Sequence, residues 1–427
     1  MKSRLKRLLG FSALPFISAM TPLLLLPIVA RLGGPEGWAS VSIGQAVGAF
    51  GSVAIGYGSM IWGPPAIASS SRDVDRRAIY ARVLSSKVLI SCIVFPSIVL
   101  ITMMMSPPKH LLEGIGMALS MALIGWSPSW YLIGLGKPGP IAIVETIPKL
   151  VATALSACLL LWTGIIWFYP LCLILATGLG LSLFHRQVLG SMWPRIRPFS
   201  LDTLRMLRFR SNAALIDASG VAYVAAPIPV VSTGGNVSEI SSVASGDKIY
   251  RYGLFGIVAL ANAVQGWVLE PKASDAFRRH IVAIVAHITL GLIGLVFLCV
   301  AGPLATEILF GSSVAAKNPM MAFYGVAYFS VSASTPFVRN LLIPAGKTRV
   351  VLSATIIGAV IGLPSMMLFN STSGASGVAL GLAISEVLVL VITVFAAIPL
   401  IGNFRHLEDS ETSALMQLEN GTSERIN

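Results

Sequence analysis

The chain has 427 residues, of which 55% are hydrophobic and only 11% charged, and its mean hydropathy is +0.81. A soluble protein this apolar could not cover its own surface, so this composition excludes a soluble globular class and requires a bilayer as the solvent. The net charge of +12 lies in short clusters between apolar runs, which favours positive-inside membrane topology over nucleic-acid binding.

The N-terminus begins with a cluster of basic residues between Lys2 and Arg7. The apolar run 8–30 that follows has 23 residues, whereas the apolar region of a signal peptide has roughly 7–15. The sequence therefore predicts an uncleaved first membrane span.

Apolar windows along the rest of the chain match the roughly 20 residues that a helix needs to cross a bilayer. Windows 141–184 and 350–400 are long enough for two spans each, divided near Thr163-Gly164 and in the turn-rich segment 370–377. The prediction is an all-α integral membrane protein with about twelve transmembrane helices. The single-span windows are 8–30, 37–71, 88–108, 114–136, 211–231, 252–269, 281–301 and 319–343.

Basic residues fix the expected orientation. With the N-terminus inside, 25 of the 30 Lys and Arg residues fall in inner segments and 5 in outer segments. Since cytoplasmic loops are enriched in Lys and Arg, both termini are predicted to be cytoplasmic.

The longest inner connection, 185–210, divides the predicted spans into two sets of six. Its end, 199–210, repeats leucines at helical spacing beside arginines, which fits either a surface-lying amphipathic helix or a solvated loop that only fixes topology. The predicted domains are an N-terminal six-helix bundle (1–198), a linker with a C-terminal six-helix bundle (199–402) and a polar cytoplasmic tail (403–427).

Catalytic patterns are missing from the sequence. The five histidines form no HExxH-type spacing, the glycine-rich stretches lack a P-loop lysine, and the four cysteines lie in apolar stretches without CxxC spacing. No metal, cofactor or catalytic residue is predicted, and a passive or ion-coupled transporter fits better than an enzyme.

Three acids lie within predicted spans, where an ionised side chain is costly and indicates a cavity or a partner. Glu386 lies near mid-membrane and Asp217 about a third of the way in from the inner side. For both acids the alternatives are a cavity-facing, ion-coupling role and a packing hydrogen bond. Glu145 precedes Lys149 by four residues, so a local ion pair is equally consistent with its position.

Cations at span ends are the other candidate site residues. Arg31 and Arg251 are on the predicted outer side, where the positive-inside rule does not favour them, and Arg339 lies at an inner end. The alternative is that the outer pair extends to the lipid headgroups. Gln45, Asn262 and Gln265 could line a cavity or hydrogen-bond between helices.

Five segments, in order along the chain, resemble the polysaccharide-transporter family, the Wzx-type O-antigen and exopolysaccharide flippases of the multidrug/oligosaccharidyl-lipid/polysaccharide exporter superfamily. They are LLLLPIVARLGGPEGWASVSIGQAV (23–47), WYLIGLGKPGPIAIVETIPKL (130–150), VSEISSVASGDKIYRY (237–252), GPLATEILFGSSVAAKNP (302–319) and GASGVALGLAISEVLV (374–389).

The resemblance implies two six-helix bundles around a central cavity in the bacterial inner membrane. It implies a flippase for undecaprenyl-diphosphate-linked oligosaccharide in surface polysaccharide biosynthesis, working by alternating access. The diphosphate would call for cavity cations, for which Arg31, Arg251 and Arg339 are the candidates. Asp217, Glu386 or Glu145 would couple transport to an ion gradient. The implied partners are the lipid-linked oligosaccharide, membrane lipid, a polysaccharide polymerase and a chain-length regulator, with no nucleic acid.

Two other functions compete with this reading. An ion-coupled multidrug/cation antiporter of the same superfamily would need an aromatic, acid-lined cavity. A membrane polysaccharide polymerase or glycosyltransferase would need a large outer loop with Arg and His chemistry, which this chain lacks.

Overall fold

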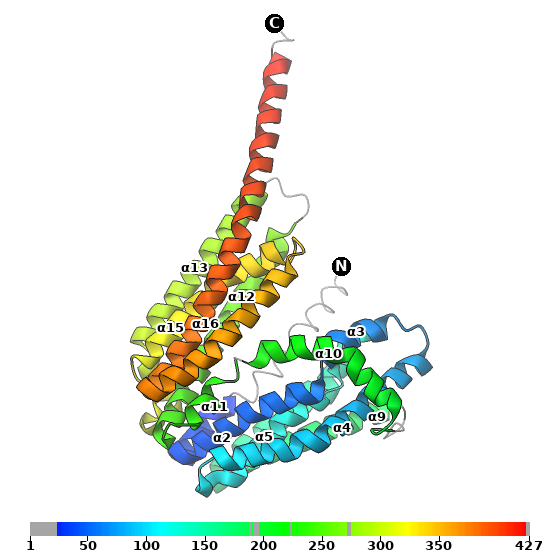
Figure 1. Cartoon of the computed structure of the whole chain (residues 1–427), viewed down its shortest axis with the longest axis vertical. Coiled ribbons are helices and arrows are strands. Elements are labelled where there is room, and N and C mark those ends of the chain that lie inside the picture. Colours follow the sequence, from blue (N-terminus) through cyan, green and yellow to red (C-terminus); the bar gives the residue numbers. More distant parts are fainter. Residues whose placement is uncertain (1–23, 188–189, 191–195, 223, 271–274, 424–427) are drawn as a thin grey trace. The chain divides into compact units, whose positions relative to one another are not determined.

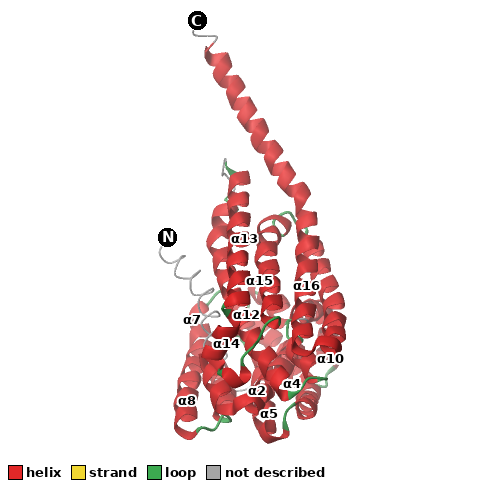
Figure 2. Ribbon diagram, turned by 90° about the vertical axis from the view of Figure 1, so that its left-hand side faces the viewer, coloured by secondary structure: helices red, strands yellow, loops and turns green. Residues whose placement is uncertain are grey.

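A computed structural model describes residues 24–187, 190, 196–222, 224–270 and 275–423. Within these ranges the protein consists of helices joined by short loops, without a strand (Figure 2). The all-α prediction is therefore confirmed. The first predicted span, 8–30, lies mostly outside the described residues.

The described residues form two compact units, which are treated separately. The first extends to Ser245 and includes Thr306–Ala315, while Gly246–Ala305 and the chain from Ala316 onward form the second. Residues 199–245, which follow the boundary predicted at residue 198, thus pack with the first unit.

The first unit holds ten complete helices among its described residues, and α2, α4 and α5 lie side by side in it (Figure 1). The helices are α2 (Leu26–Gly56), α3 (Ser59–Ala68), α4 (Asp73–Met105), α5 (Leu111–Ala122), α6 (Ser129–Gly134), α7 (Pro138–Ile141), α8 (Ile147–Thr163), α9 (Phe168–Gln187), α10 (Leu201–Ala222) and α11 (Pro227–Ser232).

The second unit is built mainly on α13, α15 and α16, with α15 packed against both of the others (Figure 1). Two helices, α12 and α14, contain residues of both units. The bounds are α12 (Val237–Val268), α13 (Ala276–Val300), α14 (Gly302–Phe310), α15 (Met320–Pro336) and α16 (Thr348–Ser423).

Both predicted divisions of the long apolar windows are confirmed. Helix α8 ends at Thr163, where Gly164 takes the left-handed conformation (φ 71°) that favours glycine. Helix α16 is interrupted at Gly374 (φ 54°), and the chain folds back on itself there, since the Ser385 hydroxyl donates to the Gly358 carbonyl at 2.8 Å. The segment 348–400 is therefore a helical hairpin that can cross a bilayer twice.

Seven helical segments of the described chain are long and apolar enough to cross a membrane, by length and composition. They are Leu26–Ala68, Asp73–Met105, Pro108–Gly134, Gly139–Thr163, Phe168–Arg186, Ala276–Val300 and Thr348–Leu400. The predicted spans 211–231, 252–269 and 319–343 correspond to α10, α12 and α15, which fall outside this set. The count of twelve remains a prediction.

Helix α4 begins fifteen residues before the window 88–108 that predicted it. Its polar first turns are held by ion pairs from Arg72 to Asp75 (2.9 Å) and from Arg76 to Asp73 (3.0 Å). A hydropathy window detects only the apolar part of such a helix. As a consequence Lys87, the residue directly before that window, lies inside the helix and is 2% exposed.

Close approach of α2 and α5 depends on small residues. A Cβ atom added at Gly48 would lie 2.7 Å from the Met121 Cβ and 3.0 Å from the Ala118 carbonyl carbon. At Gly56, in the last turn of the same helix, nothing lies within 4 Å of an added Cβ. Small residues of this kind let membrane helices pack at short axial distance.

We expect Gly48→Val to destabilise the protein by about 1–3 kcal/mol, because an overpacked contact forces α2 and α5 apart. Thermal unfolding of the purified protein in detergent measures this as a lower melting temperature. Gly56→Ala is the matched control and should melt like the wild type. Equal melting temperatures for all three proteins would contradict the proposed contact.

Candidate functional site

Polar side chains gather inside the first unit around Glu145, in a π-helical turn (Ala142–Thr146). The carboxylate accepts hydrogen bonds from the Ser127 hydroxyl (3.2 Å) and the Ser129 hydroxyl, and it pairs with the Lys149 ammonium at 2.9 Å. Of the two alternatives that the sequence left open for Glu145, the local ion pair with Lys149 is present. Three donors hold this carboxylate in place, which favours a structural contribution.

Lys87 of α4 extends this network. Its ammonium lies 3.4 Å from the Ser127 carbonyl oxygen and within electrostatic range of both Glu145 and Arg210. Burying an ammonium group is costly unless it is paired or hydrogen-bonded. The network contains three basic side chains, of Lys87, Lys149 and Arg210, and one acid, Glu145.

Arg210 is a large, buried, charged side chain that the sequence did not single out as a candidate. The side chain is 1% exposed and donates to the carbonyl oxygens of Gly56 (3.1 Å) and Tyr57 (2.6 Å). Its guanidinium also lies 5.6 Å from the centre of the Trp62 ring. The sequence grouped Arg210 with exposed arginines beside the leucines of 199–210, and its spacing does not distinguish it from Arg208.

The contacts of Arg210 lie where α2 stops and α3 begins. Tyr57 and Gly58 both take left-handed conformations (φ 44° and 68°), so the helix is broken and its last carbonyls lack helical partners. Asp217, two turns after Arg210 on α10, accepts a hydrogen bond from the Gly58 backbone amide. The two side chains of α10 thus satisfy both sides of the break, and ion coupling by Asp217 remains a prediction.

Arg31 serves as a similar cap elsewhere in the first unit. Its guanidinium donates to the carbonyl oxygens of Leu309 (3.2 Å) and Ile308, at the C-terminal end of α14. Cations are favourable at helix C-termini because of the helix dipole. The nearby Trp38 ring stacks on Phe310 at 5.3 Å, which fixes the same contact.

Arg251 lies in α12, although the sequence placed it in an outer loop. It forms an ion pair with Asp247 at 2.6 Å, and Asp247 is only 1% exposed. Lys248, between them, is also buried. The sequence missed Asp247, although its i,i+4 spacing to Arg251 was the available signal.

Arg339 has a different environment in the second unit. It lies in a π-helical turn (Phe337–Leu342) and donates to the side-chain amide oxygens of Asn262 (2.9 Å) and Gln265 (3.1 Å). These are two of the polar residues that the sequence singled out. Within the described part of the chain no carboxylate pairs with Arg339, so its charge is oriented but not neutralised.

Within the second unit, the predicted cations Arg251 and Arg339 lie apart from each other. Arg251 and the Arg339-bound Asn262 are eleven residues apart on α12, which is about 16 Å along a helix. Arg31 belongs to the first unit. Glu386 is buried (6% exposed) in the second helix of the α16 hairpin. The roles predicted for these residues remain predictions.

Removing the Arg210 guanidinium should destabilise the first unit. Hydrogen bonds to charged groups contribute about 1.5–3 kcal/mol each, so we expect Arg210→Gln to cost at least about 2 kcal/mol. The readout is the melting temperature of the purified protein, with the exposed Arg208→Gln on the same helix as control. A wild-type melting temperature for Arg210→Gln would refute the assigned capping role.

Comparison with known proteins bears on the fold and the family. A family model described as "Polysaccharide biosynthesis protein" matches residues 9–226. No curated protein matches the chain.

Among solved structures, the lipid II flippase MurJ in its inward closed conformation is similar at a TM-score of 0.68 and 15% identity, over 90% of this chain and 87% of that one. A eukaryotic MATE transporter is similar at a TM-score of 0.51 and 12% identity, over 92% and 95%. At these identities the similarity shows a shared fold.

Proposed function

Because the chain belongs to the polysaccharide biosynthesis protein family, we propose that it is a flippase for undecaprenyl-diphosphate-linked oligosaccharide. It would move this substrate from the inner to the outer leaflet of the bacterial cytoplasmic membrane, with both termini cytoplasmic. The fold is shared with a flippase of another lipid-linked substrate, lipid II, which supports the proposal.

The observation that carries the proposal is the environment of Arg339. A guanidinium costs free energy inside a membrane protein unless its donors are used, and here neutral amide oxygens use them. Neutral acceptors orient the side chain and leave its positive charge for an anion. A diphosphate offers several charged oxygens to such a group, and guanidinium binds them in bidentate fashion.

The remaining predicted residues fit this function unequally. Arg251 is paired with a buried carboxylate, and Arg31 caps a helix end. Both side chains therefore have a structural role in addition to their positive charge. The acids proposed for coupling to an ion gradient are Asp217, Glu386 and Glu145, of which Glu145 is paired with the Lys149 ammonium. A polymerase and a chain-length regulator would act on the delivered substrate.

Arg339→Gln should lower transport about tenfold or more, since a charge-assisted hydrogen bond is replaced by a neutral one. The measurement follows lipid-linked glycan in a strain that lacks the gene and any redundant flippase. We expect accumulation on the inner leaflet, full rescue by the wild type, weak rescue by Arg339→Gln and stronger rescue by Arg339→Lys.

Arg279→Gln is the matched control, because Arg279 is already paired with Glu270 and Asp275. Normal surface polysaccharide in the deletion strain, together with increased drug sensitivity, would overturn the flippase and favour the antiporter.

A further inference from the structure

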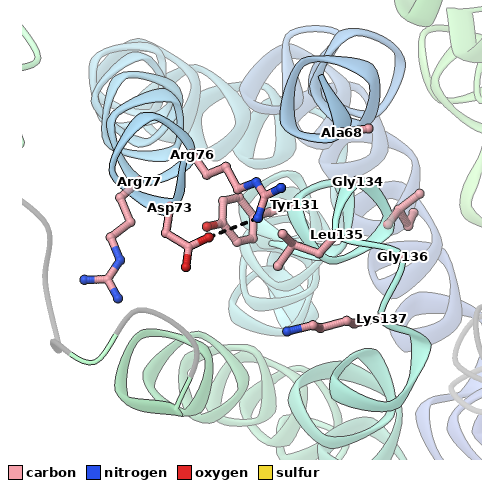
Figure 3. Close-up of a pocket in the computed structure, with 10 residues that line it drawn as sticks. Ala68, Asp73, Arg76, Arg77, Tyr131, Gly134, Leu135, Gly136 and Lys137 are labelled. Atoms are coloured by element: carbon pink, nitrogen blue, oxygen red, sulfur yellow. Dashed lines mark hydrogen bonds and ion pairs between the residues drawn. The ribbon is translucent and has the colours of Figure 1, made fainter. Parts of the chain in front are cut away.

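A pocket of about 430 Å³ opens in the first unit between the start of α4 and the loop that follows α6 (Figure 3). Three cations and one acid line it, namely Arg76, Arg77, Lys137 and Asp73. Its volume is in the range of small-molecule sites, roughly 300–1,000 Å³. The role proposed above does not use it.

One wall of the pocket is the segment Gly134-Leu135-Gly136-Lys137. The backbone amides of Gly136 and Lys137 donate to the carbonyls of Ile133 (2.9 Å) and Leu132 (3.2 Å), which is the Schellman pattern of a helix end. Gly136 has φ 67°, where a glycine is favoured. Helix termination thus explains Gly136 but not the lysine.

Two of the three cations of the pocket have no ion-pair partner among the described residues. Asp73 forms an ion pair with Arg76 at 3.0 Å. Among the described residues neither Arg77 nor Lys137 has an ion-pair partner, and in Figure 3 the Lys137 side chain extends from its loop toward α4. Two cations without an ion-pair partner, Arg77 and Lys137, therefore line one hollow, together with the paired Asp73 and Arg76.

Aromatic packing makes the floor of the pocket rigid. Tyr131, which lines it, is 4% exposed and packs edge-on against Trp130 and Tyr80 at ring-centre distances of 5.8 and 5.6 Å. Tyr131 also lies within electrostatic range of Asp73, Arg76 and Arg77. The packed aromatic rings thus fix the backbone beside the cations, so that binding an anion there would require little ordering of the backbone.

We propose that this pocket binds a phosphate-bearing headgroup, with Lys137 and Arg77 as its principal ligands. Lysine and arginine are the side chains that proteins use for phosphate recognition, arginine as a fork and lysine as a point charge. In the predicted orientation, the charged residues of the pocket lie in the inner connections that follow the windows 37–71 and 114–136, at the level of the inner headgroups. Its chemistry does not depend on which substrate the protein moves.

The test measures binding to the purified full-length protein in a zwitterionic detergent at fixed salt. The probes are inorganic pyrophosphate, as a free anion, and farnesyl diphosphate, as a lipid-linked one. We expect saturable binding that becomes about tenfold weaker in both Lys137→Gln and Arg77→Gln. Arg82→Gln, an exposed arginine farther along α4, is the control and should bind like the wild type.

Tighter binding of farnesyl diphosphate than of pyrophosphate would identify a lipid as the source, and equal binding a free phosphate. Either supports the site if the two pocket variants lose it. Unchanged affinity in both variants, with wild-type melting temperatures, would overturn the proposal. Absence of binding of both probes to the wild type would also overturn it, whether or not the protein proves to be a flippase.

Discussion

Inside a bilayer no water is available to satisfy a broken helix, and this constraint shapes the first unit. Helix α2 ends at Gly56, and the chain reverses its backbone conformation at Tyr57 and Gly58 before α3 begins. The carbonyl oxygens of Gly56 and Tyr57 accept hydrogen bonds from the Arg210 guanidinium, and the Gly58 backbone amide donates to the Asp217 carboxylate. One helix, α10, thus closes the interruption of another, because unsatisfied backbone groups cost several kcal/mol each in hydrocarbon.

The same requirement separates two kinds of cation among the described residues of this protein. Arg31, Lys87 and Arg210 all donate to backbone carbonyl oxygens, at or near places where a helix ends. Arg339 instead donates to two side-chain amides, whose rotamers can change without unwinding a helix. When a cation that is hydrogen-bonded to the carbonyls of a helix end moves away, those carbonyls lose their donors, which costs free energy. A cation that is hydrogen-bonded to side-chain amides can instead exchange an amide oxygen for a ligand oxygen. The second kind is therefore better suited to transport.

Patterns local in sequence predicted the structure well. The helical class, the stop at Thr163-Gly164, the interruption within 370–377 and the Glu145–Lys149 pair all follow from composition, glycine position or i,i+4 spacing. Contacts between distant segments did not follow. The partners of Arg31 lie 277 and 278 residues away, and those of Arg210 lie 153 and 154 residues away. The hydropathy window also predicted too late a start for α4, because the first turns of this helix are polar and are stabilised by ion pairs.

Asn262 and Gln265 satisfy the hydrogen-bond donors of Arg339 without neutralising its charge. They lie three residues apart on α12, so they face the same side of that helix, and both oxygens converge on one guanidinium from a π-helical turn. A carboxylate in either position would have paired with Arg339 and cancelled the charge, as Asp247 does with Arg251 on the same helix. An aliphatic residue would have left the guanidinium donors without these acceptors. Amides meet both conditions, since they accept the hydrogen bonds and leave the positive charge of Arg339 available to the diphosphate of the proposed substrate.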